Sequence, residues 1–512
     1  MTGSKDAKEA KAPKVEGIEG LHRLRRRQIA FIVGLTALLC TAAVSPAWAQ
    51  DDGPAVTFQL TDVTRFESWS FFEPYDPFAD PTYTLLGNRA TMAVSLEGRR
   101  VDLRGAFQYA QLLGVPEEPA FLAPLGPGST YFDSAGAPRM YQLYIRAMSL
   151  RVKSRSGVSL EAGRMDFLSA AEDLMPSDGV DRLTRDRLAG RLIGGADWTP
   201  FERAFDGARI DVTRKHWRAT SALLFPTQGA FEESANPTMG ALRLITGSLA
   251  VRWPPRDSQA GETAPTSELQ VFADHYHDRR DVATRPDNTR RDASRADVTI
   301  ATIGASHVSV LPWRAGQLDA VVWAAGQFGD WYGSDHAAYS LIVEGGFEWR
   351  RRWAPHLRAG YLQASGDRNA EDSTHGTFFP MLPSTPPPLL AGTFAQMNLR
   401  QGFLDLRVTP SPRLALSASV TRMSLAHAAD LWYSGTGATA TRGDYFGFSG
   451  QPAFGVTGLG TLVQTSAERS ITSNWRVKGE FGVMRGGDVV RQRYAGDRLL
   501  VFALESRLAL GK

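Results

Sequence analysis

The chain has a single cysteine in 512 residues, Cys40, and it lies in an N-terminal segment that resembles an export signal. A basic stretch precedes an apolar run over residues 29–44, which is shorter than the about 20 residues of a membrane helix. Ala47-Trp48-Ala49 then supplies the small residues that a signal peptidase needs. We therefore expect residues 1–49 to be a cleaved signal peptide, and residues 50–512 to form a protein without disulfides.

Common catalytic motifs are missing as well. The sequence contains no Gly-x-Ser-x-Gly nucleophile elbow and no glycine-rich phosphate loop of the required spacing. His275 and His277 could share a metal on one face of a strand, but the sequence around them offers no recognisable third ligand. The prediction is therefore no catalytic residues, no metal and no cofactor.

Lysine is scarce beyond the leader, and net positive charge is absent there. Residues 50–512 contain 49 basic and 50 acidic residues, and 45 of the 49 cations are arginine. A near-neutral chain lacks the electrostatic footprint of a nucleic-acid-binding protein, so no nucleic-acid partner is expected. The arginine excess has two explanations: a GC-rich genome, or a function in which planar guanidiniums recognise carboxylates.

Long apolar runs are also absent after the leader, and segments of alternating apolar and polar residues replace them. This period-two pattern is typical of the strands of a membrane β-barrel. It predicts 18 strands, over residues 56–70, 88–98, 101–113, 139–152, 157–166, 205–214, 216–226, 240–253, 267–278, 297–310, 316–329, 339–352, 355–365, 399–409, 413–424, 456–468, 474–485 and 498–510.

The connections between these segments mostly alternate between long and short, as in outer-membrane barrels with short periplasmic turns and long external loops. The connection over residues 254–267 is the exception, because it is long for a short-turn place. The predicted fold is therefore an all-β transmembrane antiparallel barrel of about 18 strands with long extracellular loops, in a bacterial outer membrane. A soluble all-β protein is the structural alternative, which the export signal and the even strand count disfavour.

Strand parity predicts a lumen of nearly balanced charge. Eight cations would face it (Arg104, Arg146, Arg209, Arg358, Arg407, Arg476, Lys478 and Arg507), together with seven anions (Asp102, Asp211, Glu344, Glu348, Asp405, Glu480 and Glu505). Cross-strand ion pairs that stiffen the wall explain these residues at least as well as a selectivity ladder does.

One stretch, Arg187 to Arg209, combines four arginines, four glycines, Asp197, Trp198 and Asp206 in a folded polar loop. Its order Arg191-Leu-Ile-Gly194, Asp197-Trp198 and Arg203-Ala-Phe-Asp-Gly-Ala-Arg209 resembles the outer-membrane alginate-export family. Ala364-Ser-Gly-Asp367 and Pro380-Met-Leu-Pro383 extend the resemblance to a later loop. The family's Gly-Arg-Gln-Glu is here Gly163-Arg164-Met165-Asp166. The parity of Arg164 places it on the lipid face unless it lies at the rim, snorkels or lies beyond a bulge.

The resemblance implies an outer-membrane channel for passive diffusion or export of a hydrophilic anionic solute or an alginate-like exopolysaccharide, with outer-membrane lipid around it and a periplasmic secretion partner as a further candidate. A general small-solute porin, and an outer-membrane enzyme or adhesion barrel, are the alternatives. We expect selectivity to depend on loop arginines that have no carboxylate partner. The candidates are Arg187, Arg191, Arg203 and Arg209, supported by Asp197, Trp198, Asp206, Arg104, Arg358 and Arg407.

Overall fold

The computed structural model describes residues 54–117, 126–135, 137–171, 179–254, 264–280, 287, 297–384, 393–437 and 447–511. The predicted signal peptide and most of the unusually long turn lie outside these residues. Among the described residues, no helix is both long enough and apolar enough to cross a bilayer.

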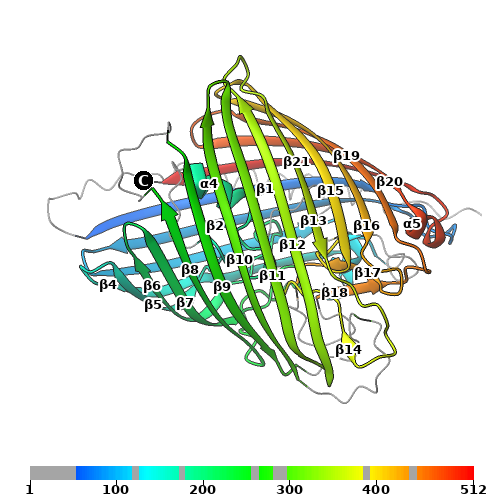
Figure 1. Ribbon diagram of the computed structural model, residues 1–512, viewed down its shortest axis with the longest axis horizontal. Coiled ribbons are helices and arrows are strands. Elements are labelled where there is room, and N and C mark those ends of the chain that lie inside the picture. Colours follow the sequence, from blue (N-terminus) through cyan, green and yellow to red (C-terminus); the bar gives the residue numbers. More distant parts are fainter. Residues whose placement is uncertain are drawn as a thin grey trace, which may run out of the picture. The chain divides into compact units, whose positions relative to one another are not determined.

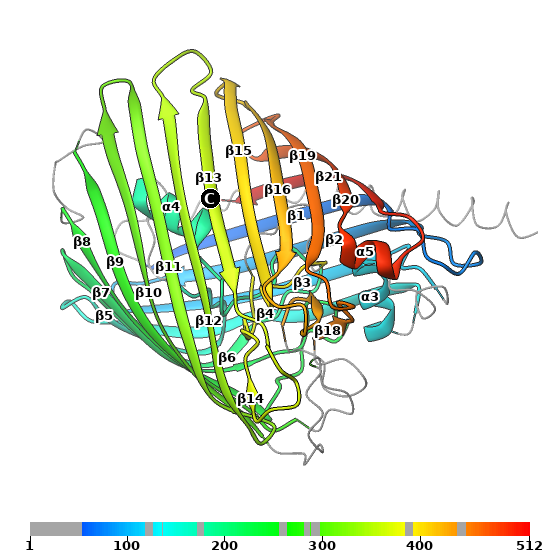
Figure 2. The same cartoon turned by 45° about the vertical axis from the view of Figure 1, so that its right-hand side comes forward.

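Eighteen long strands form one closed antiparallel barrel, in which each strand pairs with the next along the chain (Figures 1 and 2). β1 pairs with β2 on one side and with the last strand, β21, on the other, so the sheet has no free edge. The strands are β1 (Ala55–Ser70), β2 (Thr82–Glu97), β3 (Val101–Leu113), β4 (Arg139–Lys153), β5 (Val158–Met165), β6 (Phe205–Thr213), β7 (Trp217–Pro226), β8 (Leu242–Trp253), β9 (Thr266–Asp278), β10 (Val298–Trp313), β11 (Gly316–Trp331), β12 (Ser334–Trp349), β13 (His356–Ala364), β15 (Leu399–Ser411), β16 (Leu414–Leu425), β19 (Gly458–Ser470), β20 (Trp475–Gly486) and β21 (Arg498–Gly511).

The remaining elements belong to the long loops at one end of the barrel. β14 (Thr374–His375) pairs in parallel with the start of β12, and β17 (Trp432–Gly435) forms a hairpin with β18 (Phe448–Gln451). Three short helices complete the part of the fold that the structure describes: α3 (Pro127–Ala135), α4 (Gly179–Arg187) and α5 (Asp488–Arg493). We call this end the loop end and the opposite end, where both β1 begins and β21 finishes, the turn end.

The barrel confirms the predicted fold and all 18 predicted strands, with two displaced starts. β2 begins at Thr82 and β12 at Ser334, six and five residues before the predicted positions. The first residues of β12, Ser334, Asp335 and His336, are polar on both faces, so no apolar alternation marks them. Their backbone nevertheless pairs with β11, because ladder hydrogen bonds do not require an apolar face.

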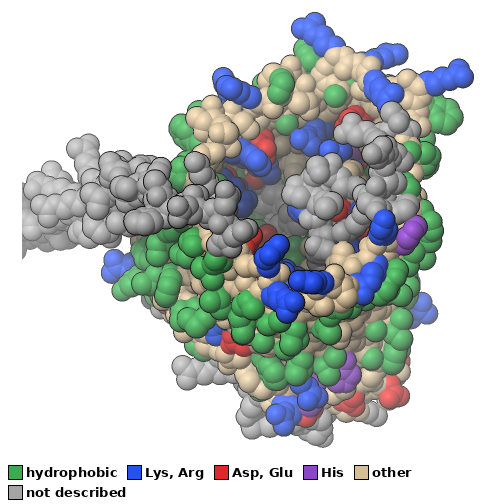
Figure 3. All heavy atoms as spheres, turned by 90° about the vertical axis from the view of Figure 1, so that its left-hand side faces the viewer, with side chains coloured by type: hydrophobic (Ala, Val, Ile, Leu, Met, Phe, Trp, Pro, Cys, Tyr) green, Lys and Arg blue, Asp and Glu red, His purple; other side chains and the backbone are tan. Residues whose placement is uncertain are grey.

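The strands separate an apolar outer face from an inner face that is buried or polar. In β12, Leu341 and Val343 are exposed to the outside, whereas Ile342 and Glu344 are buried on the inside. In the space-filling view, hydrophobic side chains cover the flank, while charged side chains appear around and within a hollow (Figure 3). Such an outer surface fits the hydrocarbon region of a bilayer.

Candidate functional site

The connection between β5 and β6, residues 166–204, folds into the barrel, and we call it the constriction loop. Its helix α4 contacts β9 and β10 on the inner wall (Figure 2). Gly179 lies beside Val310, near the turn end of β10. The constriction loop therefore descends from the loop end nearly to the turn end before it returns.

Two ion pairs attach α4 to the wall. Asp181 accepts a hydrogen bond from Arg252 of β8 at 2.9 Å, and Arg187 donates to Asp319 of β11 at 2.6 Å. All four side chains are buried, so solvent screens these pairs only weakly. Because the partners come from separate strands, α4 is held at two places along the wall.

The returning part of the constriction loop packs on the loop between β13 and β15. The amide of Gly194 donates to the carbonyl of Leu382 at 2.8 Å, and the amide of Ser384 donates to the carbonyl of Gly190 at 2.7 Å. At position 194 a Cβ atom would lie 2.4 Å from the Ser384 Cβ, which is too close for any other residue without movement. The glycines of the family motif thus permit the close approach of two loops.

Arg203 joins three loops and is fully buried. Its Nη2 donates to the carbonyls of Thr436 at 2.8 Å and Pro383 at 3.4 Å, while its Nε and Nη1 have no hydrogen-bond partner within the described chain. Burial lowers the pKa of Arg203 to about 9, so the guanidinium remains charged at neutral pH. This position ties the loops together and is not open to a passing solute.

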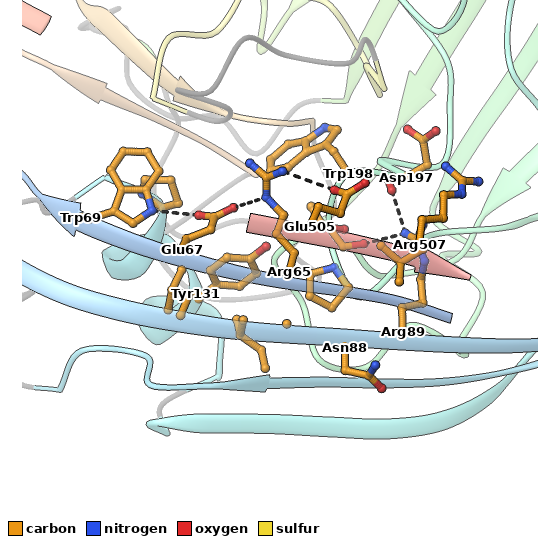
Figure 4. A pocket seen from close by; sticks show the side chains of 17 residues that line it. Arg65, Glu67, Trp69, Asn88, Arg89, Tyr131, Asp197, Trp198, Glu505 and Arg507 are labelled. Carbon is orange, nitrogen blue, oxygen red and sulfur yellow. Dashed lines mark hydrogen bonds and ion pairs between the residues drawn. The ribbon is translucent and has the colours of Figure 1, made fainter. Parts of the chain in front are cut away.

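Trp198 lies between two cavities. The smaller, about 90 Å³, is lined by β1, β2 and β21 together with the loop segment 197–200, and we call it the β1–β2 cavity (Figure 4). Arg65 occupies it, paired with Glu67 at 2.6 Å, Glu480 at 3.0 Å and Glu505 at 3.3 Å. Arg89 donates to the backbone carbonyls of residues 197 and 199 at 2.7 and 2.9 Å, which holds the loop tip against β2.

The larger cavity, about 300 Å³, lies on the other side of Trp198 against β12, β13, β15, β16 and β19, and we call it the β12–β16 cavity. Three guanidiniums approach Glu344 in it: Arg358 at 3.3 Å, Arg187 at 3.8 Å and Arg191 at 3.9 Å. The Arg358 guanidinium also lies 4.8 Å from the centre of the Phe403 ring. The cavity thus combines cations with aromatic rings, including Trp198, Phe394, Phe403 and Phe448.

Arg191 is the least compensated cation in the β12–β16 cavity. Its Nη2 donates to the carbonyl of Arg187, its Nε has no partner within the described residues, and Glu344 is its only carboxylate within 4.0 Å among them. Burial lowers the pKa of Arg191 to about 10, which leaves it charged at neutral pH. Of the four arginines proposed from the sequence, it is the one that both lines a cavity and lacks a close carboxylate partner.

The other arginines predicted from the sequence lie outside the constriction loop, on the strands of the wall. Arg209 pairs with Glu161 at 2.9 Å and Asp211 at 3.0 Å in the wall, and Arg104 pairs with Asp166 at 3.0 Å. Arg407 is exposed on the lumen side of β15 and forms no ion pair with the residues that the structure describes. The wall pairing expected for most lumen charges is therefore seen at Arg209, while Arg407 is an exception.

The two aspartates of the motif do not orient the loop guanidiniums. Asp206 instead binds Arg164 through two hydrogen bonds of 2.8 Å, next to the loop end of β5 and β6. Both residues lie where their strands end, so Arg164 is at the rim of the barrel. This explains how a charged side chain can occupy a position whose parity faces lipid. Asp197 accepts a hydrogen bond from the Ser384 hydroxyl at 2.8 Å, and burial raises its pKa.

Several charged residues of the inner wall were missed from the sequence, for two reasons. Arg65 and Arg89 follow the inner parity of their strands, so the alternation could have identified them. Arg151 faces the lumen and pairs with Asp211 at 3.1 Å only because a register shift at residues 106 and 107 of β3 reverses the parity of β4. His275 and His277 lie on the outer face of β9, and the described residues contain no group of three metal-binding side chains.

Asp430 ties together the loops that cover the β12–β16 cavity. Its carboxylate accepts hydrogen bonds from the Thr377 hydroxyl at 2.6 Å and the amide of Asp367 at 2.8 Å in one loop. From its own loop it accepts the Tyr433 hydroxyl at 2.6 Å and the Leu431 amide at 2.7 Å. Burial raises the pKa of Asp430 to about 6, although these hydrogen bonds act in the opposite direction.

This raised pKa predicts tighter loop docking in acid. Because the docked state holds a proton on Asp430 that the undocked state releases, the stabilisation is complete below the usual pKa near 3.8 and is lost as the pH rises through about 6. The loss amounts to at most about 3 kcal/mol. Hydrogen exchange over residues 426–435, corrected for intrinsic pH effects, should accelerate between pH 4 and pH 7. The variant Asp430→Asn should remove this dependence, whereas Asp372→Asn, at an exposed carboxylate of the partner loop, should retain it.

A closed barrel with an apolar outer band, long loops at one end and a loop folded through a charged interior defines the class of outer-membrane channels. Known structures share the fold: OccAB4 of Acinetobacter baumannii aligns over 90% of this chain and 100% of its own, with a TM-score of 0.52 and 8% identity. OpdK of Pseudomonas aeruginosa aligns over 90% and 99%, with a TM-score of 0.52 and 10% identity. A second OpdK structure, solved with vanillate, aligns over 89% and 99%, with a TM-score of 0.52 and 9% identity.

Residues 140–498 match the family described as Alginate export, and the chain belongs to that family. It is a family of channels and exporters, not of enzymes. The match includes the whole constriction loop, both loops that pack against it and every wall strand that lines the β12–β16 cavity. No curated protein sequence matches the chain.

Proposed function

We propose that this protein is an outer-membrane channel for hydrophilic solutes that carry carboxylates, with sugar acids of the uronate type, single or in short chains, as its substrates. The observation that carries the proposal is the cluster of Arg187, Arg191 and Arg358 around a single glutamate in the β12–β16 cavity. Guanidiniums recognise carboxylates with a planar fork of donors. Membership of the alginate export family agrees with an anionic saccharide cargo.

The size and lining of the β12–β16 cavity support a small substrate or a short stretch of a longer one. A volume of about 300 Å³ is at the lower end for small-molecule sites. Aromatic rings beside the guanidiniums offer flat apolar surfaces to a sugar ring, and the vanillate in the OpdK structure is likewise an organic carboxylate. Conduction requires binding that is weak enough to release the solute, and the opposing Glu344 limits the local excess of positive charge.

Planar-bilayer recording of the purified barrel tests this proposal. In a salt gradient the reversal potential should show a preference for anions, and galacturonate added to one side should interrupt the current in a concentration-dependent way. Galactose, its uncharged counterpart, should interrupt the current far less at the same concentration. Equal effects of the two sugars would favour a general small-solute porin, a preference for cations would exclude an anionic cargo, and the absence of any current would exclude a channel.

A further inference from the structure

The turn end of the barrel carries a collar of positive charge. Seven of its turns are described completely: residues 98–100, 154–157, 214–216, 314–315, 350–355, 412–413 and 471–474. They contain ten basic residues and no acidic residue. The basic collar consists of Arg99, Arg100, Arg155, Arg214, Lys215, Arg314, Arg350, Arg351, Arg352 and Arg413.

The collar is not a consequence of the arginine-rich composition alone, because two loops at the loop end have the opposite charge. Loops 71–81 and 227–241 together contain five acidic residues and no lysine or arginine. All ten collar residues are exposed, and none of the nine arginines forms an ion pair within the described part of the chain. Figure 3 shows lysine and arginine side chains spread along the rim of the molecule at the end where the C-terminus lies.

Tryptophans next to the collar show which way it faces. Trp217, Trp253, Trp313 and Trp475 lie at the turn ends of their strands, exposed and on the outer face with the lipid-facing residues, and Trp353 is exposed within a turn. Exposed tryptophans in this position mark the headgroup level of a bilayer. The collar therefore begins at the depth where lipid headgroups begin.

Two collar arginines are bound to these tryptophans and not to the lumen. The Arg214 guanidinium lies 5.8 Å from the centre of the Trp217 ring, and the Arg352 guanidinium lies 5.4 Å from that of Trp353. Cation–π contact with an outward ring holds Arg214 on the membrane side of the barrel. A collar that served only the channel mouth would direct its cations toward the axis.

We propose that the basic collar binds the headgroups of anionic phospholipids, such as phosphatidylglycerol, in the leaflet that meets the turn end. The exposed guanidiniums present hydrogen-bond donors to phosphate oxygens, and the adjacent tryptophans set them at headgroup depth. The resulting shell of anionic lipid fixes the vertical position of the barrel and neutralises the collar.

Quenching of tryptophan fluorescence by brominated lipids tests whether the collar binds anionic phospholipid. The full-length protein is reconstituted in an equimolar mixture of phosphatidylglycerol and phosphatidylcholine, with brominated chains on one lipid or on the other. Brominated phosphatidylglycerol should quench about two-fold more than brominated phosphatidylcholine. Molar salt should abolish the difference because it screens exposed charges within a few ångströms.

Two variants test whether the preference for phosphatidylglycerol comes from the collar or from exposed arginines elsewhere. Replacing Arg214, Arg350 and Arg352 together by glutamine should reduce the excess quenching by phosphatidylglycerol. Arg485→Gln, at an arginine whose side chain is 83% exposed at the loop end, should leave it unchanged. Equal quenching by the two lipids in the unaltered protein at low salt would overturn the proposal. So would variants that retain the lipid preference but lose the anion preference of the current, since the collar would then serve the channel mouth.

Discussion

Replacing Asp181 and Arg187 together by alanine is expected to release the constriction loop and raise the single-channel conductance about two-fold or more, because ionic current increases with the open cross-section. Each substitution removes one member of a buried ion pair that attaches α4 to the wall. The cost of breaking such a pair is largest, about 3–5 kcal/mol, where the remaining charge is left unpaired, and smaller where it keeps another partner. Losing both ties weakens the docking of α4 and shifts the loop toward an undocked state.

The wall is expected to survive this double substitution. Asp319 keeps the imidazole of His356 at 2.7 Å, Glu344 keeps Arg358 at 3.3 Å, and Arg252 keeps Glu268 at 4.0 Å. Each wall charge therefore retains a partner, and the strand ladders are untouched. Circular dichroism should show little change in the thermal unfolding of the barrel.

Arg182 offers a matched control for the release of α4. It is exposed on the same helix and forms no ion pair with the described residues. Arg182→Ala should leave the conductance near that of the unaltered protein. If the double variant also behaves in this way, the contacts of residues 190–203 hold the loop without the two ion pairs.

Replacing Arg191 by glutamine is expected to reduce the preference for anions about five-fold or more. A unit charge about 4 Å from a passing ion contributes between about 1 and 4 kcal/mol, depending on how much water the site contains. Arg191 contributes this charge with little opposition, because its nearest described carboxylate is 3.9 Å away and is shared with two other arginines. The reversal potential in a salt gradient measures the effect directly.

The conservative variant Arg191→Lys separates charge from architecture. It should retain most of the anion preference but weaken the interruption of the current by galacturonate, because an ammonium lacks the planar fork of donors. If Arg191→Gln leaves the reversal potential unchanged, selectivity lies elsewhere in the lumen, and the exposed Arg407 is the next residue to replace.

The strands could be predicted because their pattern is local. A residue that faces lipid must be apolar, so each strand carries its own period-two signal. The signal is absent where that constraint ends, as in the first residues of β12, which extend beyond the apolar band. It also misassigned Arg151, because a bulge between β3 and β4 reverses which residues of β4 face the lumen. Loop order followed from parity, and the family motif singled out residues 187–209, but the position of the constriction loop inside the barrel is visible only in the structure.

The partners of the loop arginines could not be predicted, because each depends on residues far apart in the chain. Arg187 meets Asp319 across 132 positions, and Arg203 meets the carbonyl of Thr436 across 233. Neither contact leaves a pattern in the sequence near either residue. The same residue type therefore became a wall tie at 187, a buried loop tie at 203 and a cavity cation at 191.

The sequence by itself determined that this protein is an outer-membrane barrel with 18 strands, since lipid and water impose opposite chemistry on alternate residues of every strand. It also singled out the loop that narrows the lumen. Only the tertiary structure decided which arginines remain uncompensated there, because charge compensation depends on distances of a few ångströms between strands and loops that are remote in the chain. That difference moved the expected selectivity from a group of four arginines to Arg191 and its neighbours in the β12–β16 cavity.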